Sequence, residues 1–174
     1  MPAVRIFLAG GTGVIGIRLI PLLRDAGHHV AGMTRSAQRA DAVRDAVINE
    51  LTDLPDDVNE IPATTERNIR MRREGTGNLL AATGALPGPR RRFVVQSVAW
   101  ELPGEGGVAA LDQERTVLDF GGVVVRYGQF YGPGTYWEDE TPPDPRIQID
   151  DAARRTLPAL EAEPGSVLEV VDSA

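Results

Sequence analysis

Short apolar runs alternate with amphipathic segments along most of this chain. The first run, residues 4–9, is rich in apolar and β-branched side chains and ends at a glycine, which is typical of a buried parallel strand. Apolar side chains then recur at helical spacing over residues 14–26, and the stripe stops at Gly27, which predicts a helix end. Pro21 lies inside this stripe, so we expect a slight kink there.

The rest of the pattern predicts strands and helices in turn. We expect strands at residues 29–34, 47–52, 92–96, 122–127 and 167–171, and helices at 36–46, 65–83, 108–120 and 150–161. Regular alternation of the two predicts an α/β fold: a single Rossmann-like domain, residues 1–174, with a doubly wound, mainly parallel sheet. Within it we expect a dinucleotide-binding core (1–131) and a reduced C-terminal segment (132–174), in which 132–145 is loop.

A glycine-rich turn, Gly10-Gly11-Thr12-Gly13-Val14-Ile15-Gly16, joins the first strand to the first helix. In such a turn the first glycine permits the tight bend, the second lets the backbone approach a pyrophosphate, and the third lets the helix pack closely. The free N–H groups at the helix start then favour phosphate. The expected dinucleotide contacts are Gly10, Thr12, Gly13, Val14, Ile15 and Gly16, with Leu51 and Thr52 at the end of the third predicted strand. The alternative is a purely structural turn.

The end of the second strand carries the nucleotide preference in folds of this kind. An acid there accepts the ribose 2′-hydroxyl, whereas a basic residue favours a 2′-phosphate. This sequence has Arg35 at that place, with Arg39 one helical turn later. We therefore expect NADP(H) in preference to NAD(H), which stays possible; the alternative is a solvated arginine at a strand end, and no cofactor if the site is degenerate.

Composition excludes several kinds of chemistry. The chain has no cysteine and two histidines, which are adjacent, so we expect no metal site. A net charge of −7 argues against nucleic-acid binding. No stretch reaches the roughly 20 apolar residues of a membrane span, so we expect a cytoplasmic protein without membrane contact. All 18 basic residues are arginine, which removes any mechanism that needs a lysine amine.

Five segments together resemble one known family. They are the glycine turn, Glu74–Leu80, Gln96-Ser97, Arg126–Gly134 and Ile149–Ala153. Their kind and order resemble the extended or atypical short-chain dehydrogenases/reductases, the NAD(P)-dependent epimerase/dehydratase-like proteins. The resemblance implies a Rossmann fold, a nicotinamide cofactor, a small organic substrate and a possible homodimer.

The sequence also departs from that family. The family's proton donor is a tyrosine followed four residues later by a lysine, and the region between Ser97 and Arg126 contains neither. The family's helix asparagine falls on Arg72, which puts the family's water relay in doubt. Two segments look shortened: a strand and helix before Val47, and a substrate-capping segment after Gly134.

The remaining candidates for catalysis are Ser97, Tyr127 and Tyr131. Ser97 ends a central strand, at the edge where open α/β sheets place ligands, and the resemblance implies that it hydrogen-bonds a substrate carbonyl; the alternative is an ordinary strand-end serine. Loops at the same open edge should bring further side chains beside it: Trp100, Glu101, Tyr127, Tyr131, Tyr136 and Trp137. We expect the acids Glu101, Asp112 and Glu114 to be solvated; the alternative is that a buried one serves as acid or base, since burial raises a carboxyl pKa. The arginines Arg67, Arg70, Arg72 and Arg73 are also expected to be solvated, with contact to an anion or a partner as the alternative.

Three functions fit these features. The first is an NADP(H)-binding enzyme that acts on a small organic substrate with a non-standard proton donor such as Tyr127 or Tyr131. The second is a non-redox enzyme on the same scaffold, a cyclase, dehydratase or isomerase. The third is a non-catalytic nucleotide sensor or interaction protein. The absence of lysine weighs against the first, and the glycine turn weighs against loss of nucleotide binding.

Overall fold

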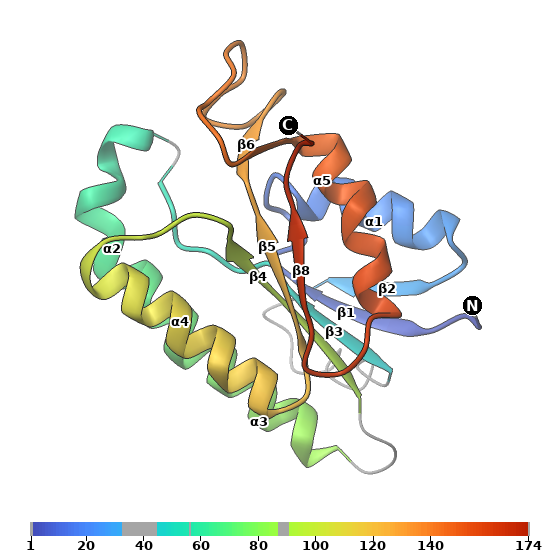
Figure 1. The fold of residues 1–174 in the computed structure, drawn as a ribbon. Coiled ribbons are helices and arrows are strands. Elements are labelled where there is room, and N and C mark those ends of the chain that lie inside the picture. Colours follow the sequence, from blue (N-terminus) through green and yellow to red (C-terminus); the bar gives the residue numbers. More distant parts are fainter. Residues whose placement is uncertain (1, 33–44, 56, 87–90, 174) are drawn as a thin grey trace.

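A six-stranded sheet forms the centre of the molecule (Figure 1). The computed structural model describes residues 2–32, 45–55, 57–86 and 91–173. The strand order is β2-β1-β3-β4-β5-β8, and every neighbouring pair is parallel. The strands are β1 (Arg5–Ala9), β2 (His29–Gly32), β3 (Ala46–Asn49), β4 (Arg92–Val98), β5 (Val123–Tyr127) and β8 (Val167–Val170). The predicted α/β class and parallel sheet are confirmed.

Helices cover both faces of this sheet (Figure 1). On one face, α1 (Gly16–Asp25) and α5 (Ile149–Thr156) bury an apolar cluster that includes Leu19 and Ala152. On the other, α3 (Thr76–Ala85) and α4 (Gly104–Asp119) bury a cluster that includes Leu80 and Val117, and α2 (Ile61–Arg70) packs beside α4. The short turns are η2 (Val58–Glu60), the π-helical η3 (Met71–Gly75) and η4 (Leu157–Leu160). No helix of the described residues is both long and apolar enough to cross a membrane.

The strand order reverses between β1 and β3, which makes the sheet doubly wound as predicted. In open α/β sheets, ligands bind beyond the carboxyl ends of the strands at such a reversal. Within the described part of the chain, β2 is the outermost strand on its side. The prediction that a strand and helix are shortened before Val47 concerns residues 33–44, which lie outside the described residues. The helix expected over 36–46 and the candidate Arg35 lie largely outside the described residues.

Some element boundaries differ from the predicted ones. The helix expected at 65 begins at Ile61, with Pro62 in its first turn, where proline is tolerated. The helix expected at 108 begins at Gly104, because packing overrides the low helix propensity of its glycine-rich start. A separate two-stranded pair, β6 (Gln129–Tyr131) with β7 (Arg146–Gln148), was not predicted. It depends on a contact across the long loop, which local pattern does not report.

Candidate functional site

Two glycines of the turn are required by close backbone packing, and one is not. A Cβ on Gly16 would lie 2.2 Å from the carbonyl oxygen of Gly10. A Cβ on Gly10, whose φ is +85°, would lie 2.5 Å from the carbonyl oxygen of Glu50. Gly13 differs, because its Cβ would meet the Gly10 oxygen only at 3.4 Å and the residue is exposed. The fold therefore tolerates a methyl group at Gly13.

The turn presents main-chain donors that the protein itself does not use. Gly13 N–H donates to Gly10 O at 3.0 Å, but the N–H groups of Thr12, Val14 and Ile15 have no acceptor among the described residues. No side chain caps α1, and no acid lies in its first turn. Thr12 and Gly13 are exposed. Free donors at a helix N-terminus fit the pyrophosphate of a dinucleotide.

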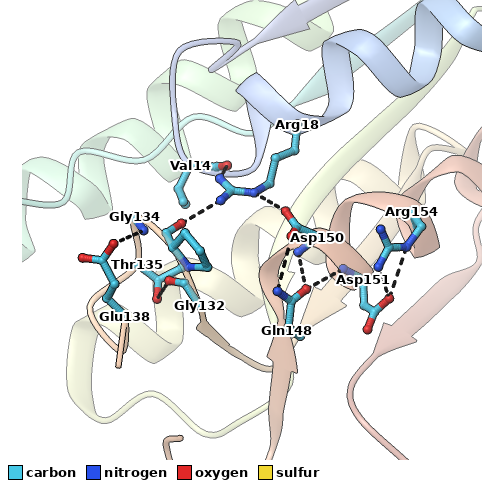
Figure 2. Close-up of polar contacts among 11 residues, drawn as sticks. Val14, Arg18, Gly132, Gly134, Thr135, Glu138, Gln148, Asp150, Asp151 and Arg154 are labelled. Carbon is cyan, nitrogen blue, oxygen red and sulfur yellow. Dashed lines mark hydrogen bonds and ion pairs between the residues drawn. The ribbon is translucent and has the colours of Figure 1, made fainter. Parts of the chain in front are cut away.

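Arg18 ties this turn to the C-terminal part of the chain (Figure 2). Its Nη1 donates to Val14 O at 2.8 Å, its Nη2 to Pro133 O at 2.7 Å, and its Nε to Asp150 Oδ1 at 2.6 Å. These bonds hold the pKa of Asp150 below its usual value. Gln148 accepts from the Asp150 N–H at 2.6 Å and so caps the start of α5. Sequence reasoning missed Arg18, since two of its partners, Pro133 and Asp150, are distant in sequence.

The ends of β3 and β4 add few free groups beside the turn. Leu51 O accepts from Gln96 Nε2 at 3.1 Å, and Leu51 N–H donates to Asn49 Oδ1 at 3.2 Å. Thr52 is exposed. Both candidate residues therefore lie near the strand reversal, but Leu51 is engaged by the protein's own side chains.

Ser97 is paired with a buried acid. Its Oγ donates to Glu114 Oε1 at 2.6 Å, and Arg126 donates to both oxygens of that carboxylate, at 3.0 and 2.5 Å. Glu114 is 5% exposed, so the expectation that it is solvated is wrong. Burial opposes its ionisation, but the hydrogen bonds from Arg126 and Ser97 outweigh burial and hold the pKa of Glu114 below its usual value.

The pairing changes what Ser97 can do. Because its proton points at an ionised carboxylate, the Ser97 oxygen offers lone pairs to a ligand and no donor. A carboxylate with a lowered pKa is also a weak general base. The arrangement does not provide an activated nucleophile, and it does not provide the carbonyl contact that the family resemblance implied.

A cavity of about 630 Å³ lies beside Ser97. The loop from β4 to α4 and the first turns of α4 line it, and strand β5 and the edge strand β8 contribute Arg126 and Glu169. Trp100 and Glu101 line it, as expected for this edge of the sheet. Tyr127, Tyr131, Tyr136 and Trp137 are not among its lining residues.

Tyr127 lies on the opposite face of the sheet from Ser97. It is 2% exposed, and its hydroxyl lies 2.6 Å from Thr156 Oγ1 and donates to Glu50 Oε1 at 3.3 Å. Burial raises the pKa of Glu50 to about 8 and raises that of Tyr127 well above its usual value. The second carboxyl oxygen of Glu50 is buried without a partner among the described residues. The sequence expectation that Tyr127 reaches an open edge is therefore wrong.

The other tyrosines near this edge are also engaged. Tyr131 in β6 donates to Asp172 Oδ2 at 2.9 Å, and this hydrogen bond raises the pKa of Tyr131. Tyr136 donates to the carbonyl of Pro55. The structure therefore does not bring Ser97, Tyr127 and Tyr131 together as one group.

Arg72 is buried, and not solvated as expected. It is 6% exposed, and its Nη1 donates to Gln113 Oε1 at 2.7 Å. Gln113 Nε2 and Asn49 Nδ2 both donate to Thr76 Oγ1, at 2.8 and 3.1 Å. This network joins the end of β3 to α3 and α4. Burial lowers the pKa of Arg72.

Comparisons with known proteins agree with this architecture. No family profile matches the chain. A 3-diazoavenalumate denitrifying reductase of a Streptomyces species is 28% identical over 232 alignment positions, which cover 97% of this chain and 76% of the relative. Since 232 exceeds the 174 residues of the chain, the relative carries insertions.

Solved structures match nearly the whole chain. The human epimerase family protein SDR39U1 (isoform 2), solved with NADPH, has a TM-score of 0.73 at 20% identity, over 98% of this chain and 75% of that one. A UDP-glucose 4-epimerase of Brucella ovis, solved with NAD, has a TM-score of 0.74 at 17% identity, over 97% and 77%. The fold is therefore that of epimerase/dehydratase-like short-chain dehydrogenases/reductases.

Proposed function

We propose that this chain is a nicotinamide-dependent reductase of the epimerase/dehydratase-like type. The observation that carries the proposal is the glycine turn, whose exposed apex and unused N–H groups fit a pyrophosphate. Thr12, Gly13, Val14 and Ile15 would hold the diphosphate. A reduced nicotinamide supplies a hydride when it is bound there.

The nucleotide preference is part of the same proposal. We assign Arg35 to the 2′-phosphate of NADP(H), because a basic residue after the second strand favours that group. Leu51 and Thr52, beside the strand reversal, are assigned to the neighbouring part of the nucleotide. Replacement of Arg35 by Ala should weaken NADPH binding more than NADH binding.

The substrate should need no proton from the protein. The chain has no lysine, and the proton of Ser97 is committed to Glu114. The Streptomyces relative is named for acting on a diazo compound, and an aryl diazonium carbon meets this requirement. There the hydride that a reduced nicotinamide supplies would form the new C–H bond, while the C–N bond breaks and its electron pair leaves with dinitrogen, so no proton is consumed. We therefore propose a diazo or similarly electron-poor acceptor.

The three candidate catalytic residues, Ser97, Tyr127 and Tyr131, then have different roles. Ser97 lies at the cavity and contacts the substrate as a hydrogen-bond acceptor. Tyr127 and Tyr131 act as positioning residues: Tyr127 links β5 to α5 through Thr156, and Tyr131 fixes β6 to Asp172. Neither tyrosine hydroxyl is free to serve as the proton donor in this arrangement.

Gly13→Ala tests cofactor binding without disturbing the fold. The added methyl has room within the protein, 3.4 Å from the Gly10 oxygen, but it projects from the exposed turn where phosphate would bind. We expect NADPH binding, followed by cofactor fluorescence, to weaken roughly a hundredfold, a change of about 2.7 kcal/mol. Gly77→Ala, on an open position of α3, is the matched control and should leave binding unchanged.

Two outcomes would contradict the proposal. If neither NADPH nor NADH binds the wild-type protein at millimolar concentration, the nicotinamide role is wrong. If NADPH binds but is not oxidised with a panel of aryl diazonium and carbonyl acceptors, the nucleotide-sensor alternative is favoured. This alternative is supported by the hydroxyls of Ser97, Tyr127 and Tyr131, each of which donates to a carboxyl group of the protein itself.

A further inference from the structure

The cavity beside Ser97 has an acidic wall. Three carboxylates and one guanidinium line it: Glu101, Glu114, Glu169 and Arg126. Their formal charges are three negative and one positive, which leaves a net of −2. Arg126 is neutralised within the wall, because its Nε and Nη2 both donate to Glu114. A ligand entering the cavity therefore meets negative potential.

The polar groups that the cavity offers to a ligand are hydrogen-bond acceptors. The hydroxyl of Ser97 donates its hydrogen bond to Glu114, so toward a ligand the Ser97 oxygen can only accept. The carboxylate of Glu169 can only accept when it is ionised, and it lies close enough to Arg126 to raise the pKa of that guanidinium. Ligand groups that donate hydrogen bonds or carry positive charge match these partners.

Apolar side chains also line the cavity. They are Trp100, from the loop between β4 and α4, and two residues of α4, Val108 and Leu111, which are 46% and 59% exposed. A volume of about 630 Å³ lies within the range of small-molecule pockets. An indole face attracts cations as well as aromatic rings. The walls together suit a small ligand with one aromatic part and one cationic part.

We propose that this cavity binds a small aromatic cation, with its ring against Trp100 and Leu111 and its positive group toward Glu169 and Ser97. An ammonium or another cationic substituent on an aromatic ring belongs to this class. That the ligand is also the substrate rests on the proposed function, whereas the binding itself does not.

Three aromatic probes of similar size but different charge test the charge preference directly. Benzylammonium, benzyl alcohol and benzoate are titrated into the protein without cofactor and followed by calorimetry. We expect saturable binding of benzylammonium, at least roughly threefold weaker binding of the neutral alcohol, and none of benzoate. Raising the salt concentration should weaken benzylammonium binding, because exposed charges are screened.

The location of binding can be read from one tryptophan. The chain has two, Trp100 and Trp137, so Trp137→Phe leaves Trp100 as the reporter. Benzylammonium should change its fluorescence with the same midpoint as the calorimetric titration. Glu169→Gln should weaken binding roughly threefold, while Glu163→Gln, an exposed acid outside the cavity, should not. Urea unfolding of each variant checks that it is folded.

The results separate this proposal from the reductase proposal. Equal or tighter binding of benzoate, heat without a Trp100 signal, or equal effects of the two glutamine variants would overturn the cation site. None of these readouts involves a nicotinamide. Cation binding in a protein that binds neither NADPH nor NADH would overturn the reductase proposal and leave the cation site standing.

Discussion

The glycine turn and the ends of β4 and β5 lie at the same edge of the sheet, yet their polar groups are satisfied in opposite ways. At the turn, the N–H groups of Thr12, Val14 and Ile15 have no partner among the described residues. At the strand ends, Ser97 is bonded to Glu114 and Tyr127 to Thr156. The N–H groups of the turn are free to bind a ligand, whereas the hydroxyls at the strand ends are hydrogen-bonded within the protein.

The difference has a physical cause. The first N–H groups of a helix have no intrahelical acceptor, so the backbone itself keeps them available. A hydroxyl rotates toward any nearby acceptor, and Glu114 lies within reach of Ser97. A binding site made of backbone N–H groups therefore keeps its geometry when nearby side chains are substituted, whereas a site made of side chains does not. In this protein the glycine turn leaves hydrogen-bonding groups free for a ligand, whereas the strand ends leave no free hydroxyl on Ser97 or Tyr127.

Glu50 joins the two regions and gives the largest expected effect. Its carbonyl backs Gly10, and its buried carboxyl, with a pKa raised from 4.5 to about 8, accepts from Tyr127. Because the folded protein holds this proton more tightly, its stabilising contribution is full below about pH 4.5 and is lost as the pH rises to about 8. Urea unfolding should show wild type losing about 4 kcal/mol relative to Glu50→Gln across that range.

This measurement tests whether solvent is excluded from the Glu50 carboxyl at the strand ends. Comparison with Glu50→Gln cancels the contributions of other titrating groups, provided that the variant keeps the fold. A constant difference between the two proteins across this pH range would mean that water reaches Glu50, and the contrast between an open turn and a closed strand end would fail.

Gly16→Ala tests whether the turn is as rigid as its packing indicates. The methyl group would lie 2.2 Å from Gly10 O, so the backbone must move, and we expect a loss of about 3 kcal/mol in unfolding free energy. Gly77→Ala, with nothing near its added methyl, should instead gain up to about 1 kcal/mol. Similar stabilities for the two variants would show that the turn adapts freely.

Arg18→Met tests the link between the turn and the C-terminal loop, with the smallest effect. It removes three hydrogen bonds, to Val14, Pro133 and Asp150, and we expect a loss of about 1 kcal/mol because the region is partly exposed. Hydrogen exchange should quicken in residues 132–138. Arg24→Met, at the exposed end of the same helix, should leave that exchange unchanged; if it does not, Arg18 has no special role.

Much of the fold could be predicted from local pattern. The apolar run before Gly10 and the stripe after Gly16 placed β1 and α1, because side-chain period reports which face an element buries. The α2–η3–α3 helix and β5 were found in the same way. The pair β6–β7 was missed, since Gln129 and Arg146 meet only through a long-range register.

The candidate site was predicted less well than the fold. Ser97 was found at the end of a strand, but its partner Glu114 was expected in solvent. Nothing in the local sequence distinguishes the buried Arg72 from the exposed Arg73 beside it, or the buried Glu114 from the exposed Arg115. Their burial depends on how α3 and α4 meet the sheet.

The sequence by itself determined the doubly wound architecture, the glycine turn and the absence of a tyrosine–lysine pair, because each depends on residue type and short spacing. Only the tertiary structure decided three contacts. Ser97 donates a hydrogen bond to Glu114, Tyr127 lies in the core beside Glu50, and Arg18 of α1 donates to Asp150 of α5. Protonation and pairing depend on which distant groups share a dry space, and only the folded chain brings those groups together.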